Sequence, residues 1–185
     1  MRNRTCSFLL FLLFSLLVMT FSLKVEAQKC KPSGKSKGKK PPKGQCNQQN
    51  DSDCCKEGKY YDVYKCSPKV SAKTKAVLTI NGFGKGDGEH GKYHSNDKLI
   101  VALSSGWFNK MKRCFKNITI HGNGKSVNAM VVDECDSTMG CDKEHDYQPP
   151  CPNYIVDASK AVWKALGVPK RTGVKWISTG LMLDQ

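Results

Sequence analysis

Asp133 and Asp157 are the two carboxylates whose positions suit glycan cleavage, since paired acids that flank a glycosidic bond are the usual chemistry of that reaction. Each also has a structural interpretation. Asp157 precedes an apolar pattern typical of a helix, and as its N-cap it would stabilise that helix by about 1 kcal/mol. Asp133 ends a β-rich run and can accept hydrogen bonds from turn amides. The sequence leaves both roles open.

The stretch from 133 to 151, DECDSTMGCDKEHDYQPPC, is where we expect the functional surface, because it concentrates acids and cysteines in an otherwise basic chain. Asp142, Glu144 and Asp146 have the spacing of the first ligands in a calcium loop. However, Tyr147 stands where such a loop needs glycine, and Asn153 stands where it needs glutamate. We therefore interpret the stretch as an acidic loop clamped by cysteines. Our candidates for contact with a partner are Asp136, Asp142, Glu144, His145, His94 and Trp107.

Two tryptophans raise the question of a sugar-stacking platform. Trp107 lies in SSGWF, and Trp163 lies beside the apolar stripe of the predicted helix. That neighbourhood favours core packing for Trp163, whereas Trp107 stays a candidate for contact.

The histidines do not predict a metal site. His90 and His94 are four residues apart, but they lie in the glycine-rich stretch GFGKGDGEHGKYH, where this spacing does not bring the rings together as it would on a helix. The glycines match neither a P-loop nor a dinucleotide fingerprint. We expect no metal and no cofactor.

The N-terminus predicts export. Residues 8 to 23 carry no charge, follow Arg2 and Arg4, and lead to a small residue, Ala27, so residues 1–27 read as a secretory signal peptide. A signal anchor is the alternative, but the uncharged run falls short of the roughly 20 residues that span a membrane. The whole chain has 30 basic and 16 acidic residues, and a mature chain from Gln28 would keep 27 and 15, a net charge of +12. Such a charge would speed encounter with acidic partners and favour adhesion to pectin-like polymers. Nucleic acid is not expected as a partner, because the chain is predicted to be exported.

Nine cysteines remain after the leader, and in an oxidising compartment they predict a disulfide framework with one unpaired thiol. Adjacent Cys54 and Cys55 should have different partners. The nine candidates are Cys30, Cys46, Cys54, Cys55, Cys66, Cys114, Cys135, Cys141 and Cys151. On an exported chain, Asn117 and Asn50 open N-glycosylation sequons, and Asn117 is the better candidate because it begins a predicted strand.

The rest of the chain divides into two parts. Residues 28–70 form a basic, cysteine-rich segment with too little apolar content for a core, which should be extended and stapled by disulfides. Residues 71–185 predict a compact β domain with a tight reversal at Gly122-Asn123-Gly124. The spacing predicts one amphipathic helix from Ala158 to Leu166, ended by Gly167. The expected strands cover 76–81, 99–104, 117–121, 125–133 and 174–179.

The chain resembles kiwellins, members of the plant ripening-related protein family. The resemblance rests on KPPKGQCNQQNDSDCC, YHSND, LSSGWF and above all NAMVVDECDSTMGCDKEHDYQPPCPNYIVDASKAVWKALGV. It implies a mainly β fold, a double-psi β-barrel of the barwin and expansin type, preceded by the cysteine-rich segment. Related barrels that act on polysaccharides place a catalytic acid where this chain has Asp157, and Asp133 resembles the barrel's strand-end aspartate.

One departure from the family concerns the cysteines. Kiwellins usually have a cysteine before the YH motif, and this chain has none there, which explains the odd count. The four later cysteines can pair among themselves, so we predict that the unpaired thiol belongs to the N-terminal five.

The resemblance implies a secreted, non-enzymatic apoplastic protein of defence or ripening. We expect it to act as a monomer that binds a protein partner, such as a pathogen's secreted chorismate mutase, without stable membrane insertion. The alternative is a protein that binds, cleaves or loosens wall glycans through Asp133 and Asp157. A third hypothesis is a membrane-active peptide released from residues 28–45. This stretch has the lysines that favour anionic lipid but lacks the apolar face that such peptides need.

Overall fold

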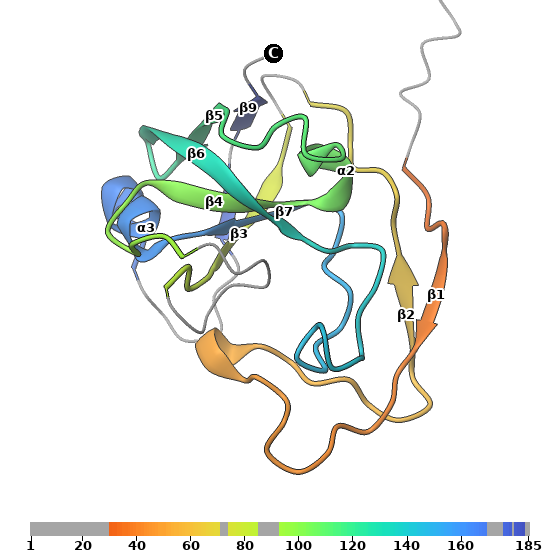
Figure 1. The fold of residues 1–185 in the computed structure, drawn as a ribbon. Coiled ribbons are helices and arrows are strands. Elements are labelled where there is room, and N and C mark those ends of the chain that lie inside the picture. The colour runs from red at the N-terminus through yellow and green to blue at the C-terminus, as the bar shows by residue number, and fades with distance from the viewer. Residues whose placement is uncertain (1–29, 71–73, 85–92, 170–175, 179, 184–185) are drawn as a thin grey trace, which may run out of the picture.

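The computed structural model describes residues 30–70, 74–84, 93–169, 176–178 and 180–183 (Figure 1). The predicted signal peptide and His90 lie outside these residues. The strands are β1 (Gly34–Lys37), β2 (Tyr60–Val63), β3 (Ala76–Ile80), β4 (Ile100–Ser104), β5 (Asn117–Gly122), β6 (Lys125–Cys135), β7 (Ile155–Ala158), β8 (Trp176–Ser178) and β9 (Gly180–Leu183). The helices are η1 (Gln49–Asp51), α2 (Ser105–Phe108) and α3 (Lys160–Leu166). No helix among these residues is long and apolar enough to cross a bilayer.

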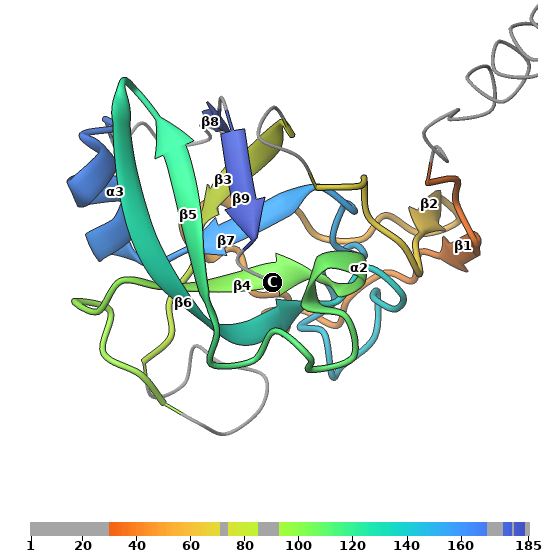
Figure 2. The same ribbon diagram turned by 90° about the horizontal axis from the view of Figure 1, so that it is seen from above.

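Seven of the described strands form one curled sheet in the order β8-β3-β7-β4-β6-β5-β9 (Figures 1 and 2). Two pairs are parallel, β3 with β7 and β4 with β6, and the antiparallel pairing of β4 with β7 joins them. β8 and β9, at the two ends of this order, are nearly consecutive in the chain, and β8 also contacts β5. The sheet therefore curls back on itself, which agrees with the mainly β, double-psi type of barrel predicted from the sequence.

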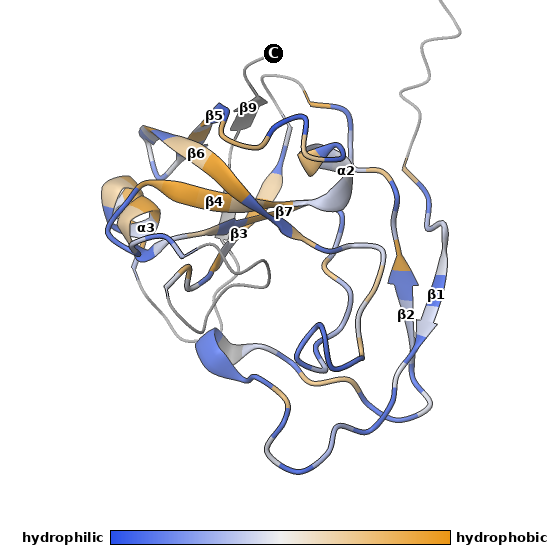
Figure 3. Cartoon of the chain, in the orientation of Figure 1, coloured by the Kyte–Doolittle hydropathy of each residue, from blue (hydrophilic) through white to orange (hydrophobic). Residues whose placement is uncertain are grey.

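The barrel core is centred on β4. All five of its residues, IVALS, are buried, as expected for an apolar run without alternation between two other strands. β5 instead alternates between buried and accessible positions, so that Ile118 and Ile120 face the core. Figure 3 shows the apolar character of β4 and of the neighbouring part of β6.

The predicted reversal between β5 and β6 is confirmed. Asn123 and Gly124 have φ angles of 51° and 69°, and the hairpin register closes at Gly122 and Lys125. Two consecutive residues with positive φ give the turn whose twist matches that of paired strands.

The predicted start of the helix is wrong by two residues. Asp157 and Ala158 belong to β7, and the N-cap of α3 is Ser159, whose hydroxyl accepts a hydrogen bond from the Val162 amide. The chain stays extended this far because β7 pairs on both sides, with β3 and β4, up to Ala158. Asp157 is therefore not a cap. At the other end, Gly167 adopts a φ of 65° and ends the helix as predicted.

The basic N-terminal segment contains more regular structure than its composition indicates. β1 pairs antiparallel with β2 in a separate ribbon, although β1 lies within the lysine-rich run. Two disulfides staple the segment, Cys30–Cys66 and Cys46–Cys54. The sequence did not predict this pairing, because β2 begins more than twenty residues after β1 ends.

Among the cysteines that the structure describes, the unpaired one is Cys114, between α2 and β5, and not one of the N-terminal five. Cys135 pairs with Cys151, but Cys141 pairs with Cys55 across 86 residues of sequence. The prediction that the four later cysteines pair among themselves was therefore wrong, because it assumed that each part of the chain closes its own bridges. Adjacent Cys54 and Cys55 do have different partners, as predicted.

Candidate functional site

The two aspartates singled out in the sequence lie in one row across the sheet, which we name the carboxyl row and which consists of Thr79, Asp157, Ala102 and Asp133. Asp157 on β7 is directly opposite Ala102 on β4, and Ala102 is directly opposite Asp133 on β6. On the other side of β7, Thr79 of β3 is opposite Asp157. Since residues in register point to the same face of a sheet, the two carboxyls share a face with only the small Ala102 between them.

An irregularity in β6 brings Asp133 into this row. The pairing of β4 with β6 shifts between Val101 and Ala102, so that Val132 is the extra residue on β6. Without the shift, Val132 would stand opposite Ala102 and Asp133 would point to the other face. The backbones of Asp133 and Asp157 are therefore two strand spacings apart, about 10 Å.

The environment of Asp157 favours its protonated form. Burial raises the pKa of Asp157 to about 6, and the charge of Asp133 acts in the same direction. The Thr79 hydroxyl, which donates to the Asp157 carboxylate at 2.7 Å, partly offsets this rise. The Asp133 carboxylate accepts a hydrogen bond from the Glu134 amide at 2.8 Å, close to the local role considered from the sequence. The pair thus places a carboxyl with a raised pKa on the same face as a second carboxylate, an arrangement that acid–base chemistry uses.

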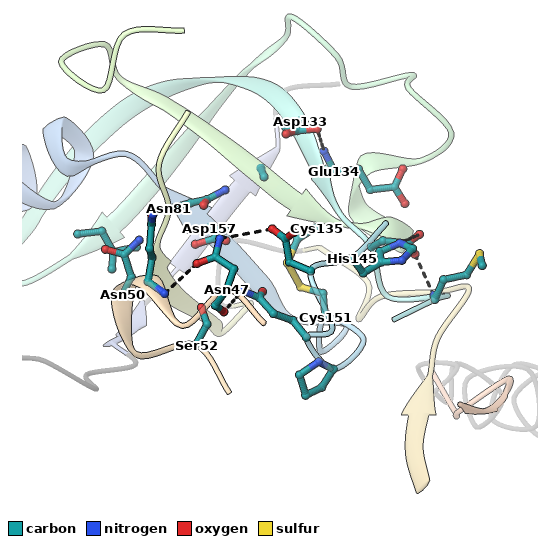
Figure 4. A pocket seen from close by; sticks show the side chains of 18 residues that line it. Asn47, Asn50, Ser52, Asn81, Asp133, Glu134, Cys135, His145, Cys151 and Asp157 are labelled. Carbon is teal, nitrogen blue, oxygen red and sulfur yellow. Dashed lines mark hydrogen bonds and ion pairs between the residues drawn. A yellow bond between two sulfur atoms is a disulfide. The ribbon is translucent and has the colours of Figure 1, made fainter. Parts of the chain in front are cut away.

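These carboxyls lie in a cavity of about 120 Å³ (Figure 4). The barrel supplies Asp133, Asp157, Ala102 and Asn81, and residues of the stretch from 136 to 151 line another side. The N-terminal segment supplies a wall of amides and one hydroxyl. This wall consists of Asn47, Gln49, Asn50 and Ser52. In Figure 4 the side chains of Asn47 and Asn50 lie around Asp157, whereas Asp133 lies farther along the sheet beside Glu134.

The amide wall is fixed to the acidic loop, which we define as residues 136–151. The Gln148 side-chain amide donates to the backbone carbonyl oxygen of Asn47 at 2.7 Å. The backbone amide of Asn47 in turn donates to the backbone carbonyl oxygen of Asp146 at 3.2 Å. Cys55, just after the wall, forms its disulfide with Cys141 of the acidic loop. The cavity is therefore built jointly by segments that are far apart in the sequence.

His145 binds two aspartates inside the acidic loop. Its Nδ1 lies 2.6 Å from Asp142 Oδ1, and its Nε2 lies 3.3 Å from Asp136 Oδ2. Burial acts to raise the pKa of Asp136, but hydrogen bonds from Thr138 and His145 outweigh it, and the pKa lies below its ordinary value. The pKa of Asp142 is lowered in the same way, mainly by hydrogen bonds from His145 acting against burial. These residues, predicted to contact a partner, are therefore held within the loop itself.

Other residues of the acidic loop are exposed. Glu144 is exposed, as a partner-contacting residue must be, and so are Lys143 and Asp146. Met139 is 53% exposed, which is unusual for a large apolar side chain, and it also lines the cavity; it was not among the partner contacts predicted from the sequence. The signal that could have identified Met139 in the sequence is that it is an apolar residue within a charged stretch.

Trp107 is not on the surface. Its side chain is 2% exposed and its indole N–H donates to the Pro68 carbonyl oxygen at 2.8 Å, so its prediction as a partner contact is wrong. Trp163 is also buried, as predicted, and its indole N–H donates to the Thr79 carbonyl oxygen at 2.9 Å. The other candidate, His94, is half-buried, and its backbone amide donates to the Phe83 carbonyl oxygen.

The described residues contain no group of three or more histidines, cysteines or acids that could hold a metal ion. His121 instead lies 2.7 Å from the Ser126 hydroxyl through its Nδ1. Of the two sequons, Asn117 is exposed at the first position of β5, and Asn50 is exposed in η1 beside the cavity. Glycosylation at either remains a prediction.

The chain is similar to known plant proteins over most of its length. The sequence profile described as Kiwellin-1 matches residues 12–179. The putative ripening-related protein 2 of Oryza sativa subsp. japonica is 56% identical over 122 residues, which are 63% of this chain and 64% of that protein. Kiwellin of Actinidia chinensis var. chinensis is 51% identical over 141 residues, 72% of this chain and 65% of that protein. This chain thus spans slightly less than two thirds of the length of both relatives.

Among solved structures, a mutant Clavibacter michiganensis expansin in complex with cellohexaose aligns over 60% of this chain and 51% of that chain, with 19% identity and a TM-score of 0.43. An alignment of this extent assigns no ligand here. The family profile, by contrast, covers nearly the whole chain, including the acidic loop and the carboxyl row. On this evidence the chain belongs to the kiwellin family.

Proposed function

We propose that this chain is a secreted binding protein of the plant apoplast that recognises a protein partner through its acidic loop and does not act as an enzyme. The observation that carries the proposal is that two disulfides hold the acidic loop in place, one to the barrel and one to the N-terminal segment. Cys135–Cys151 closes the loop on the barrel, and Cys55–Cys141 ties it to the N-terminal segment.

Fixation matters because binding costs less entropy when the contacting groups are already ordered. Inside the loop, the Tyr147 amide donates to the Asp142 carbonyl oxygen at 2.8 Å, and the Cys141 amide donates to the Gln148 carbonyl oxygen at 2.7 Å. The His145 contacts with Asp136 and Asp142 add to this network. Met139 and Glu144 are thereby presented on a rigid support, one apolar and one charged.

Secretion is part of the same proposal. Four disulfides are favoured by an oxidising compartment, and the leader predicted at residues 1–27 would direct the chain there. Family membership suggests the class of partner, a secreted enzyme of a pathogen such as a chorismate mutase. The acidic surface would suit a basic patch on that enzyme.

Calorimetric titration of the oxidised protein with a secreted fungal chorismate mutase tests the proposal. Glu144→Lys and Met139→Ala should each weaken binding by about tenfold or more, as residues near the centre of an interface do. Asp97→Lys is the matched control, because Asp97 is an exposed acid outside the loop. Unchanged affinity in both loop variants would refute the assignment of the acidic loop as the binding surface.

A second candidate function, binding or cleavage of wall glycans, is favoured by the carboxyl row. A carboxyl with a raised pKa and a second carboxylate on the same face of the sheet are the two groups that glycoside hydrolysis uses. The amide wall adds further hydrogen-bonding groups for sugar hydroxyls, but it also narrows the approach for a long polymer.

Incubation of the pure protein with wall polysaccharides separates the two candidates. Products that form with the native chain but not with Asp157→Asn would establish cleavage and overturn the non-enzymatic proposal. Asp97→Asn serves as the control for the loss of one carboxylate elsewhere.

A further inference from the structure

A second exposed surface lies between α2 and β5, in residues 109–116, which we name the cationic loop. Its sequence, NKMKRCFK, contains four basic residues and no acid. Met111 is 67% exposed and Phe115 is 55% exposed, so two large apolar side chains of this short loop face solvent. In Figure 1 this loop runs on the opposite side of β4 from the acidic loop.

The backbone of the cationic loop is held in conformations that these residue types disfavour. Asn109, Lys110 and Met111 are three consecutive residues with φ between 51° and 66°, and Phe115 has a φ of 61°. Asparagine tolerates this left-handed region, but lysine, methionine and phenylalanine rarely adopt it. Such strain persists only where the surrounding structure enforces it, and it gathers at functional sites.

Hydrogen bonds at both ends enforce this conformation. Buried Trp107 and Phe108 precede the loop, and the Arg113 guanidinium donates to the Trp107 carbonyl oxygen. At the other end, the Phe115 amide donates to the Val131 carbonyl oxygen at 2.7 Å, and the Val131 amide donates to the Lys116 carbonyl oxygen at 2.9 Å. Met111 and Phe115 are therefore held at the surface by a loop that is anchored to the barrel core.

We propose that the cationic loop docks this protein on an anionic lipid surface, with Met111 and Phe115 entering the interface and the lysines contacting lipid phosphates. Apolar side chains surrounded by cations match the two layers of such a surface, acyl chains beneath negative headgroups. A protein partner fits less well, because lysine is depleted at protein interfaces. A second copy of the chain would bring like charges together. The association is peripheral and independent of the acidic loop.

Cosedimentation with phosphatidylcholine vesicles, with and without about one third phosphatidylglycerol, tests this proposal on the oxidised full-length secreted protein. Native protein should bind only the anionic vesicles, and added salt should weaken binding. Met111→Asn and Phe115→Asn should each weaken binding about tenfold, the loss expected for an apolar side chain that no longer enters the interface. Asparagine suits both positions because it tolerates positive φ, so these variants keep the fold.

Two further variants complete the design. Lys112→Gln should reduce the salt dependence, whereas Tyr60→Thr, which removes a 59% exposed aromatic ring from β2, should leave binding unchanged. Equal binding to neutral vesicles, no binding to anionic vesicles, or full binding by both asparagine variants would each overturn the proposal. If the native chain binds no vesicles but binds an acidic protein, and the Met111→Asn and Phe115→Asn variants lose that binding, the loop would be assigned to a protein partner instead.

Discussion

Cys55 and Cys141 lie 86 residues apart in the sequence and are joined by a disulfide. The bond fastens the N-terminal segment to the acidic loop, and both segments line the cavity over the carboxyl row. Neither the amide wall nor the acidic loop is therefore an independent appendage of the barrel.

Removal of this bridge should destabilise the protein more than removal of Cys46–Cys54, which closes a loop of only 8 residues. Chain-entropy arguments give about 4 to 5 kcal/mol for the long loop and about 2 to 3 kcal/mol for the short one. Guanidinium unfolding of the Cys55→Ala/Cys141→Ala and Cys46→Ala/Cys54→Ala double variants measures both losses. Equal losses would contradict a dominant role for loop length.

Thiol counting should find one reactive cysteine per chain, Cys114. Within the part of the chain that the structure describes, it is the unpaired cysteine, and it is half-buried, so alkylation of the secreted protein should be slow in the folded state and complete after unfolding. Peptide mapping of non-reduced protein identifies the labelled site. A label on Cys30 or Cys66 would instead restore the expectation from the sequence.

Stability should fall with rising pH because of Asp157. Its pKa is about 6 in the folded protein against an ordinary value of 3.8, so the folded state holds the proton more tightly. The contribution is fully present below about pH 4 and is lost as pH rises through about 6, by at most about 3 kcal/mol. The free energy of unfolding can be measured between these pH values for the native protein and for Asp157→Asn. It should decline with rising pH in the native protein, and this decline should be absent in Asp157→Asn. A parallel pH dependence in both proteins would exclude the effect.

The carboxyls of the acidic loop should behave in the opposite way. The pKa values of Asp136 and Asp142 are lowered, so their contribution is present above their ordinary pKa and is lost as pH falls through the lower folded values. His145→Gln should move both pKa values upward, as carboxyl-carbon NMR titration would show. His121→Gln is the control, since the ring of His121 contacts the Ser126 hydroxyl. No movement in the His145 variant would contradict the assigned contacts.

Ser159→Ala should destabilise the protein by about 1 to 2 kcal/mol, the effect of losing an N-cap. The Ser159 hydroxyl also donates to the Lys98 carbonyl oxygen at 2.7 Å, so the loss should lie toward the upper end. Urea unfolding measures the difference. Lys160→Ala, at an exposed position one residue later, should change stability little. A Ser159→Ala variant as stable as native protein would refute its role as the cap.

Local patterns in the sequence determined much of the fold. The β-rich runs mark β3 to β6, and Asn123 with Gly124 marks the hairpin because few residues accept positive φ. Gly167 marks the end of α3 for the same reason. The long block around the acidic loop was specific enough to identify the family.

Only the tertiary structure decided how these elements form a site. The row from Thr79 to Asp133 depends on the pairing of four strands and on one extra residue, Val132, whose effect is a change of sheet face. The Cys55–Cys141 bridge and the burial of Trp107 likewise depend on segments that meet only after folding. Residue types set which contacts are chemically available, but long-range register and chain path decide which of them form, because these depend on the packing of the whole barrel.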